Sequence, residues 1–351
     1  MGEKMNNSNE EYSSRNKNGL GNNKYVDIYS SEKKKVRRSR IPVLRILSFL
    51  FFLCLGIIGG AMIYGYQTLH SFNYEEVEPE TTQEIKKEAK ELGLLNDNMV
   101  LNVMLIGSDS MSTGDHGRSD SLMVLSLNTR SKKIKVTSIM RDLWVDIPKY
   151  GKDRMNAAYA YGGSKLTIDT VQKNFGVLID RYVCVDFEGF AKIVDLLGGI
   201  DMELTAAECA YINKYSGDEH TLKGAGIKHL TGLQALHHSR NRNSKGSDYD
   251  RTSRQRDVMK AIFEALKRSS VAKMTEMISV LGPMITTNFK PSEVTRLAKA
   301  SPTYLGYEMQ EFRLPTDDNV RDETHEKKMV LAIKDTDKAK KDLKKFIYET
   351  E

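Results

Sequence analysis

Arginines gathered between residues 239 and 256 are the strongest candidates for chemistry in this chain of 351 residues. On a helix starting near residue 250, Arg251, Arg254 and Gln255 share one face, because residues three and four positions apart are neighbours. The planar guanidinium matches phosphate oxygens in pairs, so several in one site favour a ligand with a phosphate or pyrophosphate group. A solvated helix face is the alternative, although such faces usually mix Glu with Lys. The cluster consists of Ser239, Arg240, Asn241, Arg242, Lys245, Asp248, Arg251, Arg254, Gln255 and Arg256.

Two carboxylates border apolar runs earlier in the chain. Asp109 follows the run Val100–Ile106, and Asp120 comes eleven residues later, just before the run Leu122–Leu127. If these runs are neighbouring strands, Asp109 and Asp120 converge at one edge of a sheet and form an oxygen-rich site suited to Mg²⁺. The alternative is that both residues are ordinary loop or N-cap acids.

A further arginine, Arg141, directly follows a third apolar run, Ile134–Ile139, and Asp142 comes next. Alone, this placement is weak evidence for a site. For His237 and His238, a surface or structural role is favoured over metal ligation. No GxSxG, Walker, HExxH or kinase motif is present in the sequence, which argues against the common hydrolase, P-loop and zinc-protease mechanisms.

These candidates need a layered scaffold, and the apolar pattern predicts one. Strand-length runs rich in β-branched residues alternate with helical patterns, which indicates an α/β domain. The predicted strands are Val100–Ile106, Leu122–Leu127, Ile134–Ile139 and Tyr182–Val185. The predicted helices are Ser164–Phe175, Phe187–Leu197, Gly232–Arg240, Tyr249–Lys267, Pro291–Ala300 and Asp335–Glu349.

The segment from Ile46 to Leu69 carries no charged side chain and is long enough to cross the hydrocarbon core of a bilayer. Basic residues precede it and glutamates follow it, so the N-terminus is expected in the cytoplasm. A cleaved signal peptide is the alternative, but its apolar region is usually shorter. We therefore predict a disordered basic cytoplasmic tail (1–45), a transmembrane helix (46–69), an extracytoplasmic stalk (70–98) and one globular domain (99–351).

The net charge of +6 comes from the tail. Residues 1–45 hold 11 Lys and Arg against 5 Asp and Glu, and the remainder holds 42 of each sign. A basic tail beside a membrane suits anionic lipid headgroups, whereas a neutral exterior domain excludes nucleic acid as a partner. Of the three cysteines, Cys54 lies in the apolar segment, and Cys184 and Cys209 are expected to be free and buried rather than paired.

Together these residues resemble the LytR-CpsA-Psr (LCP) family of cell-wall glycopolymer ligases. The resemblance spans roughly residues 99–350. The motifs that carry it are Gly107-Ser108-Asp109, Gly117-Arg118-Ser119-Asp120-Ser121, Ser138-Ile139-Met140-Arg141-Asp142, Met155-Asn156-Ala157-Ala158-Tyr159 with Gly162-Gly163, Val185-Asp186-Phe187-Glu188-Gly189-Phe190 with Leu197-Gly198-Gly199, and the block from Arg240 to Arg256.

The resemblance implies a three-layer α/β/α domain with a central mixed sheet and an apolar tunnel, preceded by one transmembrane helix. It implies a phosphotransferase that moves an anionic glycopolymer, of teichoic acid or capsule type, from a polyprenyl-pyrophosphate carrier to peptidoglycan through a phosphodiester. Asp109 and Asp120 would hold Mg²⁺. Pyrophosphate would be bound by Arg118, Arg141, Arg240, Arg242, Arg251 and Gln255. Arg141 and Asp248 are the expected catalytic residues, and Asp248 and Asp142 are the candidates for a general base.

A non-catalytic, membrane-anchored binder or regulator of anionic polymer or polyprenyl lipid is the alternative function. The two carboxylates argue against it, because a purely cationic binder has no need of them. One departure from the family pattern is the pair Ser110-Met111, where many members place an arginine just after the first site aspartate.

Overall fold

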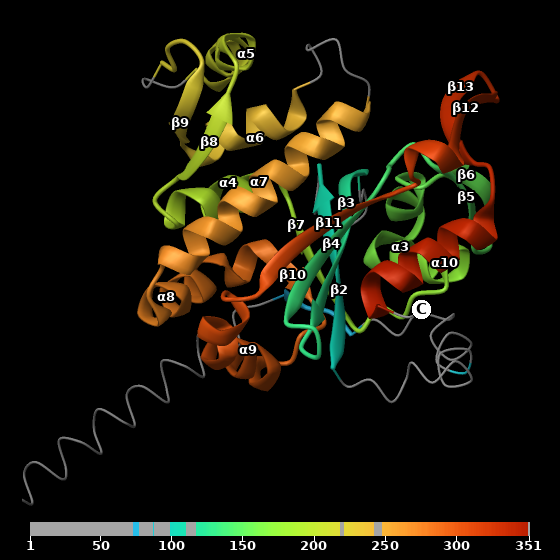
Figure 1. Cartoon of the computed structure of the whole chain (residues 1–351), viewed down its shortest axis with the longest axis horizontal. Helices are drawn as coiled ribbons and strands as arrows, with labels where there is room; N and C mark the ends of the chain where they lie inside the picture. The colour runs from blue at the N-terminus through green and yellow to red at the C-terminus, as the bar shows by residue number, and fades with distance from the viewer. Residues whose placement is uncertain are drawn as a thin grey trace, which may run out of the picture. The chain divides into compact units, whose positions relative to one another are not determined.

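The computed structural model of the chain describes residues 73–76, 87, 99–109, 117–217, 221–241 and 248–349 (Figure 1). All of these residues belong to one unit, Ile58–Glu351. The predicted tail (1–45) and transmembrane helix (46–69) lie outside the described residues, as does most of the predicted stalk (70–98). Among the helices formed by described residues, none has the length and apolar character needed to cross a bilayer.

The centre of the domain is a seven-stranded mixed sheet, in the order β1-β10-β7-β2-β3-β4-β11 (Figure 1). β2 runs parallel to β7 and antiparallel to β3, whereas β4 runs antiparallel to β3 and parallel to β11. The predicted α/β domain with a central mixed sheet is thereby confirmed. The strands are β1 (Asn73–Tyr74), β2 (Val100–Ser108), β3 (Ser119–Asn128), β4 (Lys133–Ile139), β7 (Arg181–Val185), β10 (Ile285–Thr287) and β11 (Glu308–Leu314).

Helices cover both faces of this sheet. On one face, Val124 lies in a core with Phe175 of α3 (Ala157–Phe175) and Leu343 of α10 (Thr336–Tyr348). On the other face, Met123 packs in a cluster with Phe263 of α7 (Asp248–Arg268), near α9 (Pro291–Tyr304). Successive residues of a strand point to opposite faces, so a sheet covered on both sides needs the continuous apolar runs seen in the sequence.

A second group of elements packs against the far side of α7 around Val194, Ile200, Leu230 and Val258. Each helix of this group begins at a side-chain cap, which satisfies backbone N–H groups at the helix start. Asp186 caps α4, and Thr205 and Thr231 form capping boxes with α5 and α6. The elements are α4 (Phe187–Leu196), β8 (Ile200–Leu204), α5 (Ala206–Ser216), β9 (Gly226–Leu230) and α6 (Gly232–Arg240).

Two hairpins, each a separate two-stranded sheet, lie at the end of the central sheet that carries the candidate site. β5 (Trp144–Ile147) pairs with β6 (Gly151–Arg154), and β12 (Val320–His325) pairs with β13 (Lys328–Ile333). The second hairpin is held by a bond from the Leu331 N–H to the Asp142 carbonyl, at 3.0 Å. The described chain also contains α8 (Val271–Leu281) and the short 3-10 helices η1 (Gly282–Met284) and η2 (Asp317–Asn319).

The structure corrects one predicted boundary. Asn73 and Tyr74, which fall within the predicted stalk (70–98), form β1 and pair with Thr286 and Thr287 of β10. The Tyr182 hydroxyl donates to the Glu75 carboxylate at 2.9 Å, which ties the same segment to β7. The sheet therefore begins before residue 99, because this short segment completes its edge.

The predicted strands and helices are present, with longer ends in most cases. The helix predicted at Ser164–Phe175 is the second part of α3, because a kink with non-helical backbone at Gly162 and Gly163 separates it from the turns that begin at Ala157. Helices α5 and α8 and the hairpins were not predicted. Cys184 and Cys209 are free and buried, which confirms the expectation for these two thiols.

A buried lysine joins the sheet to the last helix. Lys135 of β4 is 1% exposed, and its ammonium donates to the Phe346 carbonyl and lies 2.8 Å from the Glu349 carboxylate. Lys133 bonds to the same carboxylate at 2.8 Å. Cations are favourable at a helix C-terminus, because the unpaired carbonyls there carry partial negative charge. Hydrogen bonds from Lys133 and Lys135 lower the pKa of Glu349 to about 2.

We predict that Glu349→Gln destabilises the domain at pH 7 by roughly 1 kcal/mol, a small value because 36% of the side chain is exposed to solvent. A carboxyl whose pKa is lower in the folded state stabilises fully above the unfolded-state pKa. That stabilisation is lost as the pH falls from about 4.5 toward about 2. Urea unfolding at pH 7 and pH 3 should therefore show a smaller difference between variant and wild type at pH 3. Glu264→Gln, in an exposed pair with Lys267, is the control and should change little. An equal effect of Glu349→Gln at both pH values would contradict the assignment.

Candidate active site

The two site carboxylates lie at the end of the β2–β3 hairpin. The Asp109 N–H bonds to the Arg118 carbonyl at 3.2 Å, and the Arg118 N–H donates to the Asp109 carboxylate at 2.6 Å. Asp109 and Asp120 therefore belong to the same end of neighbouring strands, as the spacing predicts. Arg118 is exposed beside them.

A β-bulge separates Asp120 from its neighbours. Ser108 pairs with Ser119, whereas Gly107 pairs with Ser121, so Asp120 is an extra residue without an opposite partner on β2. A bulge redirects a side chain that would otherwise follow the strand alternation. Here it gives Asp120 two neighbours from distant elements, Arg141 after β4 and Gln255 on α7.

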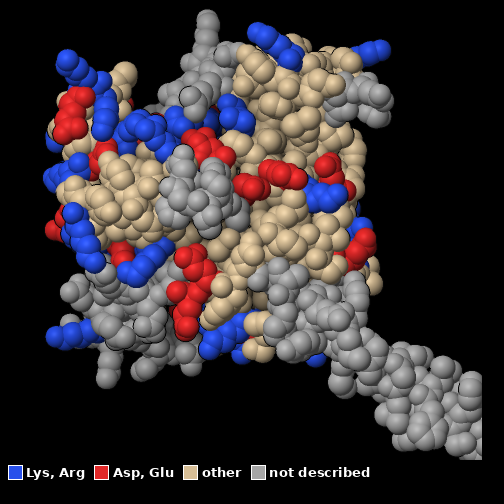
Figure 2. Space-filling model, turned by 180° about the vertical axis from the view of Figure 1, so that it is seen from behind, with Lys and Arg blue, Asp and Glu red and all other residues tan. Residues whose placement is uncertain are grey.

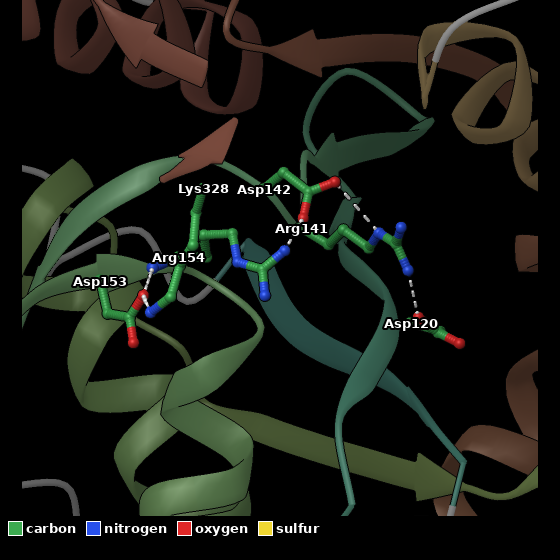
Figure 3. A network of polar contacts seen from close by, with 6 residues as sticks. All are labelled: Asp120, Arg141, Asp142, Asp153, Arg154 and Lys328. Carbon is green, nitrogen blue, oxygen red and sulfur yellow. Dashed lines mark hydrogen bonds and ion pairs between the residues drawn. The ribbon is translucent and has the colours of Figure 1, made fainter. Parts of the chain in front are cut away.

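Arg141 lies between two carboxylates (Figure 3). Its Nη1 donates to Asp120 Oδ1 at 2.6 Å, and its Nε donates to Asp142 Oδ2 at 3.3 Å. The other oxygen of Asp142 accepts from Arg154 at 3.2 Å. Because Asp142 bridges two guanidinium groups, its geometry favours orienting Arg141 over accepting a proton.

Helix α7 divides the predicted arginine cluster. Gln255 donates to the Asp120 carbonyl at 3.4 Å, and Arg251, one turn earlier on the same face, is only 4% exposed. Arg254 instead pairs with Glu208 of α5 at 3.0 Å and donates to the Asn241 carbonyl. Arg256 pairs with Glu311 of β11. The helix therefore presents Arg251 and Gln255 on the face that reaches Asp120. Arg254 and Arg256 instead connect α7 to α5 and β11.

An apolar cavity of about 210 Å³ opens beside these polar groups. Arg240, Gln255 and Asp120 contribute to its wall, and the remaining lining is largely apolar. The Arg240 guanidinium lies 4.3 Å from the centre of the Phe187 ring, a cation–π contact that holds the arginine over the cavity wall. The apolar lining includes Leu105, Ile106, Met123, Val183, Val185, Phe190, Ile193, Leu236, Val258, Met259 and Ile262.

A second apolar cavity, of about 360 Å³, lies between α8, α9 and β10. Val183 of β7 lines both cavities. Leu266 lines the second cavity, one helical turn beyond Ile262 in the first. Apolar space therefore continues from the polar end of the domain along α7.

Some predicted site residues lie outside the described part of the chain. Arg242 and the loop from Ser110 to His116 are not described. Asp248 begins α7, but its side chain is not described, so its catalytic role stays a prediction.

Charges of both signs are interspersed on the domain surface. On the face shown in Figure 2, Lys and Arg side chains lie next to Asp and Glu side chains, as expected from the balanced charge beyond the tail.

His238 is buried, and burial lowers its pKa to about 4 despite the nearby Glu208. A neutral, buried imidazole agrees with the structural role predicted for it.

The carboxylates suit a magnesium ion shared with a substrate. Across the described residues, no group of three or more His, Cys, Asp or Glu side chains is arranged to hold a metal. Mg²⁺ needs no such group, because it commonly takes one or two carboxylates, waters and substrate phosphate oxygens. Asp109 and Asp120 meet that requirement if the ligand brings a diphosphate.

Comparison with known proteins identifies the family. Residues 61–345 match the LytR_cpsA_psr family. The chain belongs to this family. Members of the LytR_cpsA_psr family among the curated proteins include a polyisoprenyl-teichoic acid–peptidoglycan teichoic acid transferase TagU from Bacillus mycoides. It is 32% identical over 281 residues, which cover 76% of this chain and 88% of that protein. A protein of the same name from Enterococcus faecalis is 30% identical and is covered to 80% of its length.

Solved structures related to this LytR_cpsA_psr chain show the same fold. TagT bound to LI-WTA is 25% identical, with a TM-score of 0.60 over 72% of this chain and 92% of that chain. TagV from B. subtilis is also 25% identical, with a TM-score of 0.57 over 73% of this chain and 100% of that chain.

Sequence reasoning missed two features of this site. Phe187 and Phe190 belong to a motif that was noted without a role, and the structure places both in the cavity wall. Their spacing of three residues on a predicted helix was an available signal. The bulge at Asp120 had no sequence signal, because it depends on which residues pair across two strands.

We predict that Met259→Trp weakens binding of dodecyl phosphate, because the larger side chain fills part of the cavity. Each excluded methylene removes roughly 0.8 kcal/mol, so a loss of about tenfold in affinity is expected. Calorimetry on the purified chain measures the affinity. Met329→Trp, at a position 78% exposed on β13, is the matched control and should bind as wild type does. Equal affinity for Met259→Trp and wild type would show that the alkyl chain binds elsewhere.

Proposed function

We propose that this protein is a phosphotransferase that moves an anionic glycopolymer from a polyprenyl-pyrophosphate carrier to peptidoglycan. The observation that carries the proposal is an apolar cavity bordered by Arg240, Gln255 and Asp120, with Arg141 ion-paired to Asp120. An amphiphile with an anionic head matches this division of apolar and charged surface. The names of the TagU relatives support the same class of reaction.

The reaction joins a hydroxyl of the acceptor glycan to the phosphorus that carries the glycopolymer. A new P–O bond forms to the acceptor, and the P–O bond to polyprenyl phosphate breaks. The acceptor proton passes to a base, for which Asp248 is the remaining candidate, because Asp142 is shared between Arg141 and Arg154. Polyprenyl phosphate leaves, and the product is a phosphodiester.

Arginines supply the charge that this transfer needs, because phosphoryl transfer depends mainly on positioning and on neutralising phosphate oxygens. Arg118 is exposed at the hairpin end and Arg240 at the cavity wall. Arg251 shares a helix face with Gln255 and is the buried member of the set. Arg242 is expected to join them by its position in the sequence. Asp109 and Asp120 would hold Mg²⁺, which would supply further neutralisation of the phosphate oxygens.

The proposal includes a location. A carrier with a long polyprenyl chain stays in the bilayer, so an enzyme acting on it must stay close to the membrane surface. The apolar segment 46–69 is the proposed single-pass anchor, with the basic tail in the cytoplasm and the catalytic domain outside.

Arg141→Ala is expected to lower transfer by about 10²–10³-fold, because it removes a cation next to the reacting phosphate. Asp109→Ala should lower it to a similar extent. The assay follows release of polyprenyl phosphate and attachment of polymer to peptidoglycan by the full chain in lipid vesicles. Arg268→Ala, an exposed arginine paired with Asp201, is the control. Transfer at the wild-type rate by either site variant would refute the assignment.

Removal of divalent metal tests the cofactor separately. EDTA should stop transfer, and added Mg²⁺ should restore it in the wild type but not in Asp109→Ala. Lipid pyrophosphate binding without any release of lipid phosphate, with Mg²⁺ present, would favour a non-catalytic binder. Release with water as the only acceptor would identify a pyrophosphatase instead.

A further inference from the structure

Two exposed tyrosines stack on one another close to the site. Tyr150, in the turn of the β5–β6 hairpin, and Tyr161, in the first part of α3, have ring centroids 4.7 Å apart at an angle of 12°. Tyr150 is 56% exposed and Tyr161 is 42% exposed. Large aromatic groups left in contact with water often mark a binding surface.

Polar contacts hold both rings in place. The Tyr161 hydroxyl donates to Asp153 at 2.7 Å, and the Tyr150 hydroxyl donates to the Tyr161 carbonyl at 3.3 Å. The chain breaks its helical path directly after Tyr161, where Gly163 takes a φ of 59°, a value that favours glycine. Tyr159 and Tyr161, two positions apart on the helix, point in different directions: Tyr159 is buried and contacts Cys184, whereas Tyr161 faces solvent. The rings are preorganised, and ordering them on binding costs little entropy.

The charged groups beside the rings are connected to the site by a row of polar contacts. Asp153 also accepts from Lys328 at 3.4 Å, and Arg154, the next residue, joins Asp142 at 3.2 Å. Figure 3 shows this row of side chains continuing through Arg141 to Asp120. The pKa of Tyr161 is raised chiefly by its bond to Asp153, and the positive charge of Arg118 opposes that rise. Arg118 therefore lies within electrostatic range of Tyr161.

We propose that Tyr150, Tyr161, Asp153 and Lys328, here called the tyrosine platform, bind a pyranose ring of a glycan substrate. A pyranose presents a face of C–H groups that packs on an aromatic ring, and its hydroxyls both donate and accept hydrogen bonds. Asp153 accepts and Lys328 donates, so the rim of the platform serves both needs. This inference rests on the proposed transferase function, which requires sugar rings on both sides of the transferred phosphate.

The charge of the platform distinguishes among ligands. A phosphate group requires an excess of positive charge, and an organic cation requires an excess of negative charge. Around the rings, the negative charges of Asp153 and Glu326 are matched by the positive charges of Lys328 and Arg118, which suits an uncharged sugar. Either the acceptor glycan or the first sugars of the donor polymer would present that chemistry, so the test includes one probe for each.

The test is direct binding of two soluble probes to the full chain in detergent. One probe is an oligosaccharide of four N-acetylglucosamine units, which represents the acceptor, and the other is a soluble sugar–phosphate oligomer, which represents the donor. Calorimetry gives the affinity, and fluorescence of Trp144 reports the location. Trp144 is the chain's one tryptophan, stacks on His325 at 4.8 Å and lies opposite Arg154 across the β5–β6 pair.

We expect saturable binding of at least one probe, weakened about tenfold by Tyr150→Ala and by Tyr161→Ala, since each removes a stacking surface. Tyr161→Phe keeps the ring and should stay within about threefold of wild type. Tyr215→Ala is the matched control, because Tyr215 is 46% exposed and contacts another tyrosine, Tyr211, on α5. Circular dichroism checks that each variant is folded. If Tyr161→Ala is not folded, the affinity of Tyr150→Ala decides the outcome.

Asp109→Ala separates this inference from the proposed function. Asp109 is not part of the platform, so this variant should bind the probes as wild type does even when transfer is lost. Binding of the N-acetylglucosamine oligosaccharide alone identifies an acceptor subsite. Binding of the sugar–phosphate oligomer alone identifies a donor subsite. Absence of saturable binding of both probes to wild type would overturn the proposal, as would equal affinity in Tyr150→Ala and wild type.

Discussion

The ion pair between Arg141 and Asp120 is the contact on which the geometry of the site depends. It joins the end of β4 to a bulge residue of β3, and Asp142 and Arg154 extend it to the β5–β6 hairpin. Arginine is suited to this position because its planar group holds two carboxylates at once and keeps its charge when half-buried. The direction of this cation, near the proposed phosphate site, is thereby fixed by acids on either side.

Helix α7 connects the two halves of the proposed chemistry. Its first turns carry the buried Arg251 and Gln255, which donates to the Asp120 carbonyl, and its later turns carry Met259 and Ile262 into the cavity wall. One helix face therefore changes from polar to apolar along its length, which is the change that an amphiphile with a charged head presents. Two ion pairs fix the helix in place: Arg254 with Glu208 joins it to α5, and Arg256 with Glu311 joins it to β11 of the sheet.

Local signals in the sequence were sufficient to predict many of the helices and strands. The helix predicted at Gly232–Arg240 is α6 with the same ends, because Thr231 and Gln234 form a capping box that can be read from the sequence. The β2–β3 pairing, on which the predicted convergence of Asp109 and Asp120 depended, is present. Contacts between distant segments were not accessible in this way. Arg254 shares a predicted helix face with Arg251, and only the packing of α5 against α7 shows that its partner is Glu208. Helix α5 was missed because few of its residues are buried, so its apolar periodicity is weak.

The pairing of β1 with β10 has a consequence for the edge of the central sheet. A sheet edge with free N–H and C=O groups is a template on which a strand from another molecule can add. The two residues of β1 cover that edge of β10, and Asn73 is tied to the Pro283 carbonyl at 3.0 Å. The segment entering from the N-terminal side thus shields the sheet from intermolecular strand addition. A shortened chain beginning at residue 99 would lose this cover and carry an open edge into solution.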